Sequence, residues 1–439
     1  MRATIIGRAV SLAASSALIV ACRDPVATGG FPPDKTDPVA GSWIAVGVGS
    51  NTACALDRDR QAFCWGANQG GLLGVDASLG RIEAPRAVGA PHLRFAQISV
   101  GARHQCALTV EGAAYCWGDN SSGQLGTGDA TGNAIHPTPV AGGLNFRAIS
   151  AGFNATCGID FDDRGFCWGD DFDGQLGIGP TTACDPESPR CPFRSPMPIS
   201  GSLHFAQISV GFQHACGVTR DGTTYCWGDD SEGALGINAL PARCATSFDR
   251  LTCNYAEPQR VRTQLKFTAV SAGMMYSCGI AVDGSAYCWG AVSGDRGVGA
   301  SHLGNATYAG YYGPYRGSGL PVPVEGGLHF REITTGLAAT CGLTLDGTAV
   351  CWGSNNFGQM GFATMSPDFT TTPRAVRMPA AAAAPARGMG DHACAVTTTG
   401  RIWCWGGYNY LGELGSPPVS PPGPGAEIRP TPSPVEAPQ

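Results

Sequence analysis

The sequence predicts an all-β chain that folds as a propeller of seven four-stranded blades. The stretch HQCALTVEGAAYCWGDNSSGQLGTG, from His104 to Gly128, returns seven times with changes. A repeat of about 50 residues is typical of architectures in which each copy supplies one structural unit. Within a copy, four short apolar runs alternate with turn residues and none has a helical period, which is the pattern of a propeller blade.

The amino-terminal residues indicate an export signal rather than a part of the fold. Arg2 and Arg8 precede an apolar run, Ala9 to Ala21, that is too short to span a bilayer. The run ends in Ile-Val-Ala-Cys, which resembles the lipobox of bacterial lipoproteins and implies that Cys22 is lipidated. A signal peptide with a chance cysteine is the alternative. We expect a signal peptide at residues 1–21, a lipid-anchored flexible tether at 22–41 and the propeller at 42–436.

Each repeat contains a hairpin whose two cysteines are ten residues apart. Counting outward from the turn Val110-Glu111-Gly112 places Cys106 opposite Cys116. Opposed residues of antiparallel strands lie about 4.5–5.5 Å apart at Cα, within reach of a disulfide. Five turns end in glycine, whereas Arg60 and Asp163 end the other two and leave the turn type open there. The predicted cross-strand disulfides are Cys54–Cys64, Cys106–Cys116, Cys157–Cys167, Cys216–Cys226, Cys278–Cys288, Cys341–Cys351 and Cys394–Cys404.

The remaining cysteines fit an exported protein. Beyond the seven hairpin pairs, the 19 cysteines leave two further pairs, Cys184/Cys191 and Cys244/Cys253, and the single Cys22. So many paired cysteines indicate an oxidising compartment. No two-residue spacing between potential zinc ligands occurs, so we expect no metal site and no cofactor.

The net charge and the lipobox-like sequence together predict the class of partner and the location of the protein. The net charge of −6 and the pI near 5.7 indicate that the protein has no extended basic surface. We therefore do not expect it to bind nucleic acid. We expect a monomer in the cell envelope that touches the membrane only through its lipid anchor. Arg23, rather than Asp, follows Cys22, which favours the outer membrane, with the domain facing the periplasm or the cell surface.

Several recurring residues are predicted to be structural. The GQLG-like glycines recur with little change and have no P-loop lysine or following helix, so we interpret them as turn residues. His104, His214 and His392 share one position, but the other four repeats have different residues there. A tryptophan follows every second cysteine, as a packing residue would. These tryptophans are Trp65, Trp117, Trp168, Trp227, Trp289, Trp352 and Trp405.

The sequence also offers little chemistry for catalysis. Asp170, Asp171 and Asp173 resemble part of a calcium loop, but Gly169 stands where the first ligand belongs and no glutamate follows at the required distance. No nucleophile and base motif or metalloprotease motif occurs. We therefore predict that the protein is not an enzyme, although residues from different blades could still assemble a site.

The pattern C-x-L-T-x-D-G-x-x-Y-C-W-G-x-N-x-x-G-Q-L-G closely resembles the repeat of the regulator of chromosome condensation family. The resemblance spans roughly residues 42 to 436 and implies a seven-bladed propeller. The family's best-known member is a nuclear guanine-nucleotide exchange factor for a small GTPase, and another resembling propeller inhibits β-lactamase. An export signal argues against a cytosolic GTPase partner.

We expect a non-enzymatic scaffold that binds another macromolecule, either a protein or an envelope component. Three alternatives stay open: an inhibitor of an exported enzyme, an exchange-factor-like regulator by family resemblance, and an envelope polysaccharide-active enzyme. The last would need carboxylates clustered at the central opening, which the repeats do not display.

The partner is predicted to bind where three neighbouring repeats are longer than the others. Successive first cysteines are 52, 51, 59, 62, 63 and 53 residues apart, and the excess falls between the GQLG-like turn and the following Pro-rich strand. Insertions at one position of adjacent repeats emerge on one face. Neutral loop drift is the alternative. The predicted anchors are Phe193, Arg194, Phe248, Arg250, Tyr255, Tyr308, Tyr311, Tyr312, Tyr315 and Arg316.

The seventh repeat is the weakest. Met389 replaces a glycine found at the end of the first strand elsewhere, and Ala380 to Ala384 replace a β-rich run, although alanine is a poor strand former. Two segments could supply the last strand of the ring, residues 37–40 near the start and Ser433 to Glu436 near the end. The sequence does not choose between them.

Overall fold

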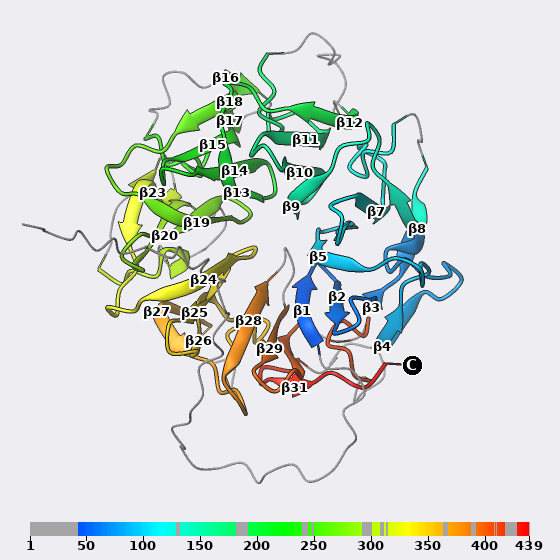
Figure 1. The fold of residues 1–439 in the computed structure, drawn as a ribbon. Coiled ribbons are helices and arrows are strands. Elements are labelled where there is room, and N and C mark those ends of the chain that lie inside the picture. The colour runs from blue at the N-terminus through cyan, green and yellow to red at the C-terminus, as the bar shows by residue number, and fades with distance from the viewer. Residues whose placement is uncertain are drawn as a thin grey trace, which may run out of the picture. The chain divides into compact units, whose positions relative to one another are not determined.

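The computed structural model describes residues 43–128, 132–180, 192–238, 245–247, 250–291, 301–307, 311–312, 315–362, 368–387, 392–407, 409, 411–417 and 428–438. Seven antiparallel sheets surround a central axis as the blades of a propeller (Figure 1). The predicted all-β fold of seven four-stranded blades is confirmed. No helix in this part of the chain is long and apolar enough to cross a membrane.

Each blade is a run of four strands that pair in chain order. Blades 1 and 2 contain β1 (Trp43–Val48), β2 (Thr52–Asp57), β3 (Ala62–Ala67) and β4 (Arg81–Ala87), then β5 (Phe95–Val100), β6 (His104–Thr109), β7 (Ala114–Gly118) and β8 (Ala134–Pro139). Blades 3 and 4 contain β9 (Phe146–Ala151), β10 (Ala155–Asp160), β11 (Gly165–Asp170) and β12 (Pro192–Pro198), then β13 (Phe205–Val210), β14 (His214–Thr219), β15 (Thr224–Asp229) and β18 (Asn254–Arg260).

The later blades follow the same plan. They contain β19 (Phe267–Ala272), β20 (Tyr276–Ala281), β21 (Ala286–Ala291) and β23 (Tyr315–Pro323), then β24 (Phe330–Thr335), β25 (Ala339–Thr344), β26 (Ala349–Ser354) and β27 (Phe369–Ala375), and finally β28 (Ala382–Arg387), β29 (His392–Thr397), β30 (Ile402–Gly406) and β31 (Ser433–Pro434). The additions are β16 (Ala245–Ser247), β17 (Arg250–Thr252), β22 (Tyr311–Tyr312) and the short 3₁₀ turns η1 (Gln69–Gly71) and η3 (Ser301–Leu303).

The first strand of each blade lies nearest the axis and the fourth lies at the rim (Figure 1). The second strands are almost entirely buried, because sheet neighbours lie on both edges and adjacent blades cover both faces. In six blades the first strand begins with a buried aromatic residue. One of these is Phe146, whose ring centroid lies 5.8 Å from that of Trp168. In blade 7 this position is Ala382.

The hairpin turns keep one conformation despite their different last residues. Gly112 has a φ of 90°, in the left-handed region that glycine enters without strain. Arg60 and Asp163 adopt φ values of 60° and 65° at the same place. The turn type in these two blades is therefore the same as in the others, because both residues adopt the left-handed backbone that the turn requires.

The carboxy-terminal segment supplies the last strand. Trp403 pairs with Pro434 and Cys404 with Ser433, so β31 completes blade 7, while residues 37–40 lie outside the described part of the chain. The alanine-rich run also forms a strand, because β28 pairs along its length with β29. Backbone pairing and burial thus override the low strand propensity of alanine.

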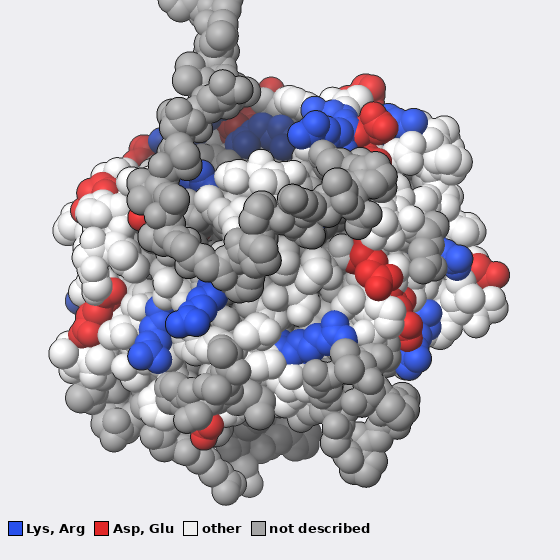
Figure 2. Space-filling model, turned by 90° about the horizontal axis from the view of Figure 1, so that it is seen from below, with Lys and Arg blue, Asp and Glu red and all other residues white. Residues whose placement is uncertain are grey.

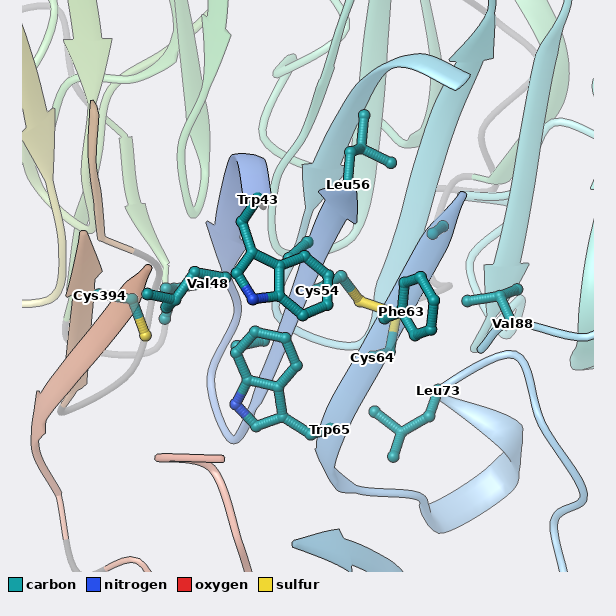
Figure 3. Packing of buried hydrophobic residues seen from close by; sticks show 14 of the residues in the cluster. Trp43, Val48, Cys54, Leu56, Phe63, Cys64, Trp65, Leu73, Val88 and Cys394 are labelled. Carbon is teal, nitrogen blue, oxygen red and sulfur yellow. A yellow bond between two sulfur atoms is a disulfide. The ribbon is translucent and has the colours of Figure 1, made fainter. Parts of the chain in front are cut away.

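Ring closure is a contact between complete blades rather than an exchange of strands. Trp43 N–H donates to the carbonyl of Gly400 at 2.9 Å, which joins β1 to the hairpin turn of blade 7. The core of blade 1 continues into blade 7, and Figure 3 shows Cys394 of β29 beside Val48 of β1. Trp65 lies in the same cluster (Figure 3).

Candidate functional site

The repeated tryptophans join each blade to the one before it. All seven side chains are buried, and Trp168 Nε1 donates to the carbonyl of Gln124 in the GQLG turn of blade 2 at 3.0 Å. The other bonds of this kind are Trp65 to Glu413, Trp227 to Gln175, Trp289 to Ala234, Trp352 to His302 and Trp405 to Gln359. The predicted packing role is confirmed, and a hydrogen bond adds to it.

The inner strands are tied together around the central opening. Gln97 Oε1 accepts the N–H of Ile149 and its Nε2 donates to the carbonyl of the same residue. Ser99 accepts the N–H of Ala151 at 2.9 Å, and Ser150 likewise accepts the N–H of Val210. These polar side chains satisfy the backbone of the next blade, so they hold the ring together rather than facing a substrate.

The predicted structural role of the histidines also holds for the two whose bonds are defined. His104 Nε2 lies 2.7 Å from Thr156 Oγ1 and His214 Nε2 lies 2.9 Å from Ser277 Oγ, in each case across a blade boundary. Burial lowers the pKa of each imidazole to about 4. His392 occupies the same position in β29 and is buried. Neutral, buried imidazoles of this kind are packing residues.

The carboxylates that resemble a calcium loop bind protein groups instead. Asp171 Oδ1 accepts the N–H of Leu176 at 2.9 Å, as Asn120 does for Leu125 in blade 2. Asp173 accepts bonds from Gln213 and Asn254. Among the described residues no group of three His, Cys, Asp or Glu side chains could hold a metal ion.

Burial has a marked effect on these two acids. It raises the pKa of Asp171 to about 7 and that of Asp173 to about 6. Asp171 stands where Asn68 and Asn409 use the amide both to accept an N–H and to donate to a carbonyl. Asp171 likewise accepts the N–H of Leu176.

The seven hairpin disulfides are formed. Cys106 and Cys116 are directly opposed in the sheet and bonded, and the Cα atoms of the seven pairs lie 4.0 to 4.1 Å apart. This separation is shorter than the sequence suggested, because opposed residues that do not share backbone hydrogen bonds approach most closely. Cys253 is buried and disulfide-bonded, whereas Cys22, Cys184, Cys191 and Cys244 lie outside the described residues. Seven disulfides indicate an oxidising compartment.

The predicted anchors fall at the end of the blades where the third strand ends and the fourth begins. Phe193 is paired with Gly169 and Tyr255 with Gly228. Both side chains are half-buried and pack against the cores of blades 3 and 4. They are thus strand residues rather than loop residues, and Arg194 follows in β12.

The other anchors that the structure describes lie in the two small ribbons. Arg250 is in β17, which pairs with β16. Tyr311 and Tyr312 form β22, which pairs with Arg316 and Tyr315 of β23 and extends the sheet of blade 5. Phe248 and Tyr308 lie outside the described residues. The structure brings these residues to neighbouring blades, and their role in binding stays a prediction.

Sequence reasoning missed a second set of exposed residues at the opposite end of the blades. The first residue of a hairpin turn is a strongly exposed apolar side chain in four blades, namely Val110, Phe161, Val282 and Leu345. The signal was present in the repeats, where an apolar residue precedes an acidic one at the turn.

Charged side chains are mixed rather than gathered by sign on the side of the molecule that Figure 2 shows. Basic and acidic side chains also pair with each other at the surface, as in the ion pairs Arg81–Glu83 and Lys266–Asp221. Nucleic-acid binding requires an extended basic surface. This side of the molecule offers none.

Comparisons with known proteins agree with the geometry. A sequence profile described as "Regulator of chromosome condensation (RCC1) repeat" matches residues 43–71, 95–124, 146–175, 205–234, 330–359 and 390–413. A second profile of the same description matches residues 111–159 and 162–218. The matched residues contain the hairpins and the GQLG-like turns.

The chain is similar to several curated proteins. It is 25% identical to the "RCC1 domain-containing protein RUG3, mitochondrial" of Arabidopsis thaliana over 384 residues, which covers 82% of this chain and 80% of that protein. It is 28% identical to the human "Probable E3 ubiquitin-protein ligase HERC6" over 69% of this chain and 26% of that protein. For the "Ultraviolet-B receptor UVR8" of Arabidopsis thaliana, the identity is 24% and the shares are 58% and 55%. The chain thus spans about a quarter and about half of the last two relatives.

Solved structures share the fold. Human WBSCR16 superposes with a TM-score of 0.65 at 17% identity, covering 80% of this chain and 85% of that one. Yeast RCC1 (Prp20) bound to Kap60 gives a TM-score of 0.66 at 17% identity, covering 93% and 90%. With its seven Cys-Trp-Gly hairpins, its seven-bladed ring and these matches, the chain belongs to the regulator of chromosome condensation (RCC1) repeat family.

Proposed function

We propose that the protein is a non-enzymatic propeller that binds another protein and is held at the cell envelope by a lipid on Cys22. This proposal rests on one observation, which is that the polar side chains that recur in the repeats are used to join neighbouring blades. Six of the seven repeated tryptophans, His104 and His214, and the inner-strand residues Gln97 and Gln207 bond to neighbouring blades. What differs between blades, and is therefore free to specify a partner, lies in the insertions and at the turns.

The insertions of blades 4 and 5 support a binding role at that end of the ring. They add the ribbon β16–β17 near β18 and the hairpin β22–β23 at the rim of the next blade (Figure 1). Strand pairing limits the freedom of such segments before binding, and a pre-organised segment loses less entropy when a partner arrives. Arginine and tyrosine are frequent at interface hot spots; arginine occurs in β17, and both occur in the β22–β23 hairpin.

Relatives of the same fold are described as protein-binding. One solved structure is of yeast RCC1 with Kap60, and another is described by the binding of Prp20p to Gsp1p and histones. We extend to this chain only the general property of binding proteins, because the identities are 17% and 20%. Seven disulfides favour a partner in an oxidising compartment.

The triple change of Tyr311, Tyr312 and Tyr315 to alanine is expected to reduce capture of the partner from envelope extract by about tenfold or more, as loss of a hot spot does. Melting should barely change, because β22 pairs only with β23. The measurement is quantitative mass spectrometry of proteins bound to the immobilised mature domain.

Val110→Ala is a matched control for this test, since it removes an exposed apolar side chain at the other end of a blade. Capture that survives the triple change and shortening of the blade 3 and blade 4 insertions would place the partner elsewhere. Turnover of an envelope polysaccharide by the domain would instead support an enzyme.

Replacing Cys22 with serine is expected to release the protein from the membrane or leave it unprocessed, because two or more acyl chains are needed for stable anchoring. Membrane fractionation and amino-terminal mass analysis measure this. Cys184→Ser serves as a control, because it alters a cysteine outside the signal. A Cys22→Ser protein that stays in the membrane with an unchanged amino terminus would refute the anchor.

A further inference from the structure

The seven hairpin turns project from one end of the blades, and their first two residues are exposed in every blade. In four blades the first residue is a large apolar side chain. Val282 and Leu345, in the adjacent blades 5 and 6, are 67% and 64% exposed, which are the two highest values among the exposed large hydrophobic residues described. Phe161 and Val110, in blades 3 and 2, are 63% and 49% exposed.

The fold does not require an apolar residue at this position. Arg58, Arg220 and Thr398 occupy it in blades 1, 4 and 7, and the turns of all three are formed. The backbone bonds are also the same with either kind of residue. The N–H of Leu345 and that of Thr398 each donate to a carbonyl in the loop before the first strand of their own blade. The exposed apolar side chains of blades 5 and 6 therefore need another explanation.

A carboxylate follows each of these apolar residues, and its pairing differs around the ring. In blades 3 and 4 basic side chains neutralise the turn acids, as in Asp162–Arg164 at 3.3 Å and Lys266–Asp221 at 2.7 Å. Within the described part of blades 5 and 6, Asp283 and Asp346 form no ion pair with Lys or Arg. In the described parts of blades 1 and 2, Asp59 and Glu111 form none either, but Arg58 rather than an apolar residue precedes Asp59. Among the described residues, blades 5 and 6 are therefore the adjacent pair in which both tips combine an exposed apolar side chain with an acid that forms no ion pair with Lys or Arg.

Both carboxylates are held in the ionised form. The N–H of Ser285 donates to Asp283 Oδ1 at 2.9 Å, and the N–H of Thr348 donates to Asp346 Oδ1 at 3.1 Å. These bonds, with the hydroxyl of Thr344 foremost for Asp346, hold the pKa of each acid below its usual value. Both residues are exposed, so their carboxylates can be reached by a partner.

The two turns are neighbours in space. His329, in the loop before β24, forms a β-bridge with Ser285 of one turn. Its carbonyl also accepts the N–H of Leu345 in the other turn at 2.9 Å. The exposed His329 therefore lies between two tips that each present an apolar side chain and a carboxylate.

We propose that this tip surface, formed by Val282, Asp283, Leu345 and Asp346, docks a segment of a partner protein in which lysine or arginine stands beside apolar side chains. Cationic side chains would bond to the two carboxylates, while the apolar side chains would bury Val282 and Leu345. Two copies of this chain placed face to face through the surface would oppose carboxylate to carboxylate. The surface lies at the opposite end of the blades from the insertions, so it is independent of the partner site proposed above.

The test uses a synthetic peptide in which lysine and leucine alternate, and a glutamate–leucine peptide of the same length, with binding measured by fluorescence anisotropy. The wild-type protein should bind the lysine peptide and not the glutamate peptide. Asp283→Asn with Asp346→Asn keeps the turn bonds, because an asparagine oxygen also accepts them. Val282→Thr with Leu345→Thr copies the residue of blade 7. Each pair of changes should weaken binding by about tenfold, as loss of a charged or a largely buried apolar contact does.

The matched control is Val110→Thr with Glu111→Gln in blade 2, which makes the same kind of change on the distant side of the ring. Its binding should stay within about threefold of wild type, a change worth under 1 kcal/mol. Equal loss in the control would reveal diffuse attraction to an acidic protein and would overturn the proposal. So would equal binding of both peptides, or wild-type dimers in sedimentation that the Val282→Thr/Leu345→Thr protein does not form, which would make the surface a self-contact.

Discussion

Reducing the seven hairpin disulfides is expected to unfold the propeller at room temperature. Closing a loop of about ten residues stabilises a fold by roughly 3 kcal/mol in the chain-entropy model, so seven closures amount to roughly 20 kcal/mol. A domain is usually stable by about 5–15 kcal/mol in total. The stabilisation from the seven disulfides therefore exceeds the usual free energy of unfolding of a domain, so we expect the reduced ring to unfold.

The measurement is a guanidinium unfolding curve for oxidised protein and for protein that has been unfolded, reduced and returned to buffer. Reductant alone should act slowly on the native fold, because the hairpin sulfurs are buried in the blade cores. Replacing Cys106 and Cys116 together with alanine gives the single-bridge comparison, expected to be roughly 3 kcal/mol less stable. A reduced protein whose midpoint matches that of the oxidised one would show that strand packing alone supports the ring.

Truncating the chain before Ile428 is expected to lower the melting temperature by about 5 °C, as a loss of roughly 4 kcal/mol does in a ring of this length. The lost segment provides β31 and the bonds Val435 N–H to Ile402 and Glu436 N–H to Gly415, each worth about 1 kcal/mol, together with burial of Val435. It also supports the turn whose Glu413 carbonyl accepts Trp65 Nε1 at 3.1 Å. Blade 7 would lose its rim strand and the support of the turn that bonds to Trp65, while the contacts of the inner strands with blade 1 would remain.

Truncation after Glu436 is the matched control, because it removes only residues beyond the last of these bonds. Its melting temperature should stay within about 1 °C of wild type, a change of under 1 kcal/mol. Trp65→Phe, set against Trp168→Phe, separates the seam bond from the same bond elsewhere in the ring. If the long truncation melts like the short one, blade 7 does not need β31 and closure rests on the inner strands alone.

The sequence predicted those features that depend on local spacing. Ten residues between cysteines dictate the register of Cys106 and Cys116 once a three-residue turn is assumed, and the structure has that register. Recurrence in every copy assigned the tryptophans to packing. The first inference needs only one repeat and the geometry of an antiparallel pair, and the second needs only the comparison of the repeats with one another.

Features that depend on distant parts of the chain could not be predicted. Segments near both ends carry a Pro-Val pair, so the choice of the closing strand rests on contacts between β30 and β31 that no local pattern encodes. Phe193 seemed to belong to an insertion because its strand begins later than in shorter repeats. The exposed Val282 and Leu345 were overlooked because the turn residues were considered for backbone conformation alone.

The pairing of neighbouring cysteines has a consequence for how the chain can mature. Each hairpin disulfide joins residues ten positions apart, so within a repeat the correct partner of a new thiol is the next one to be made. Blades can thus be locked one after another in the direction of synthesis, through local contacts that form quickly. The contacts that close the ring, such as the bond from Trp43 to Gly400 and the bond from Trp65 to Glu413 across 348 positions, must wait for the last blade. The oxidation steps are then local and early, and the long-range closure of the ring is the last.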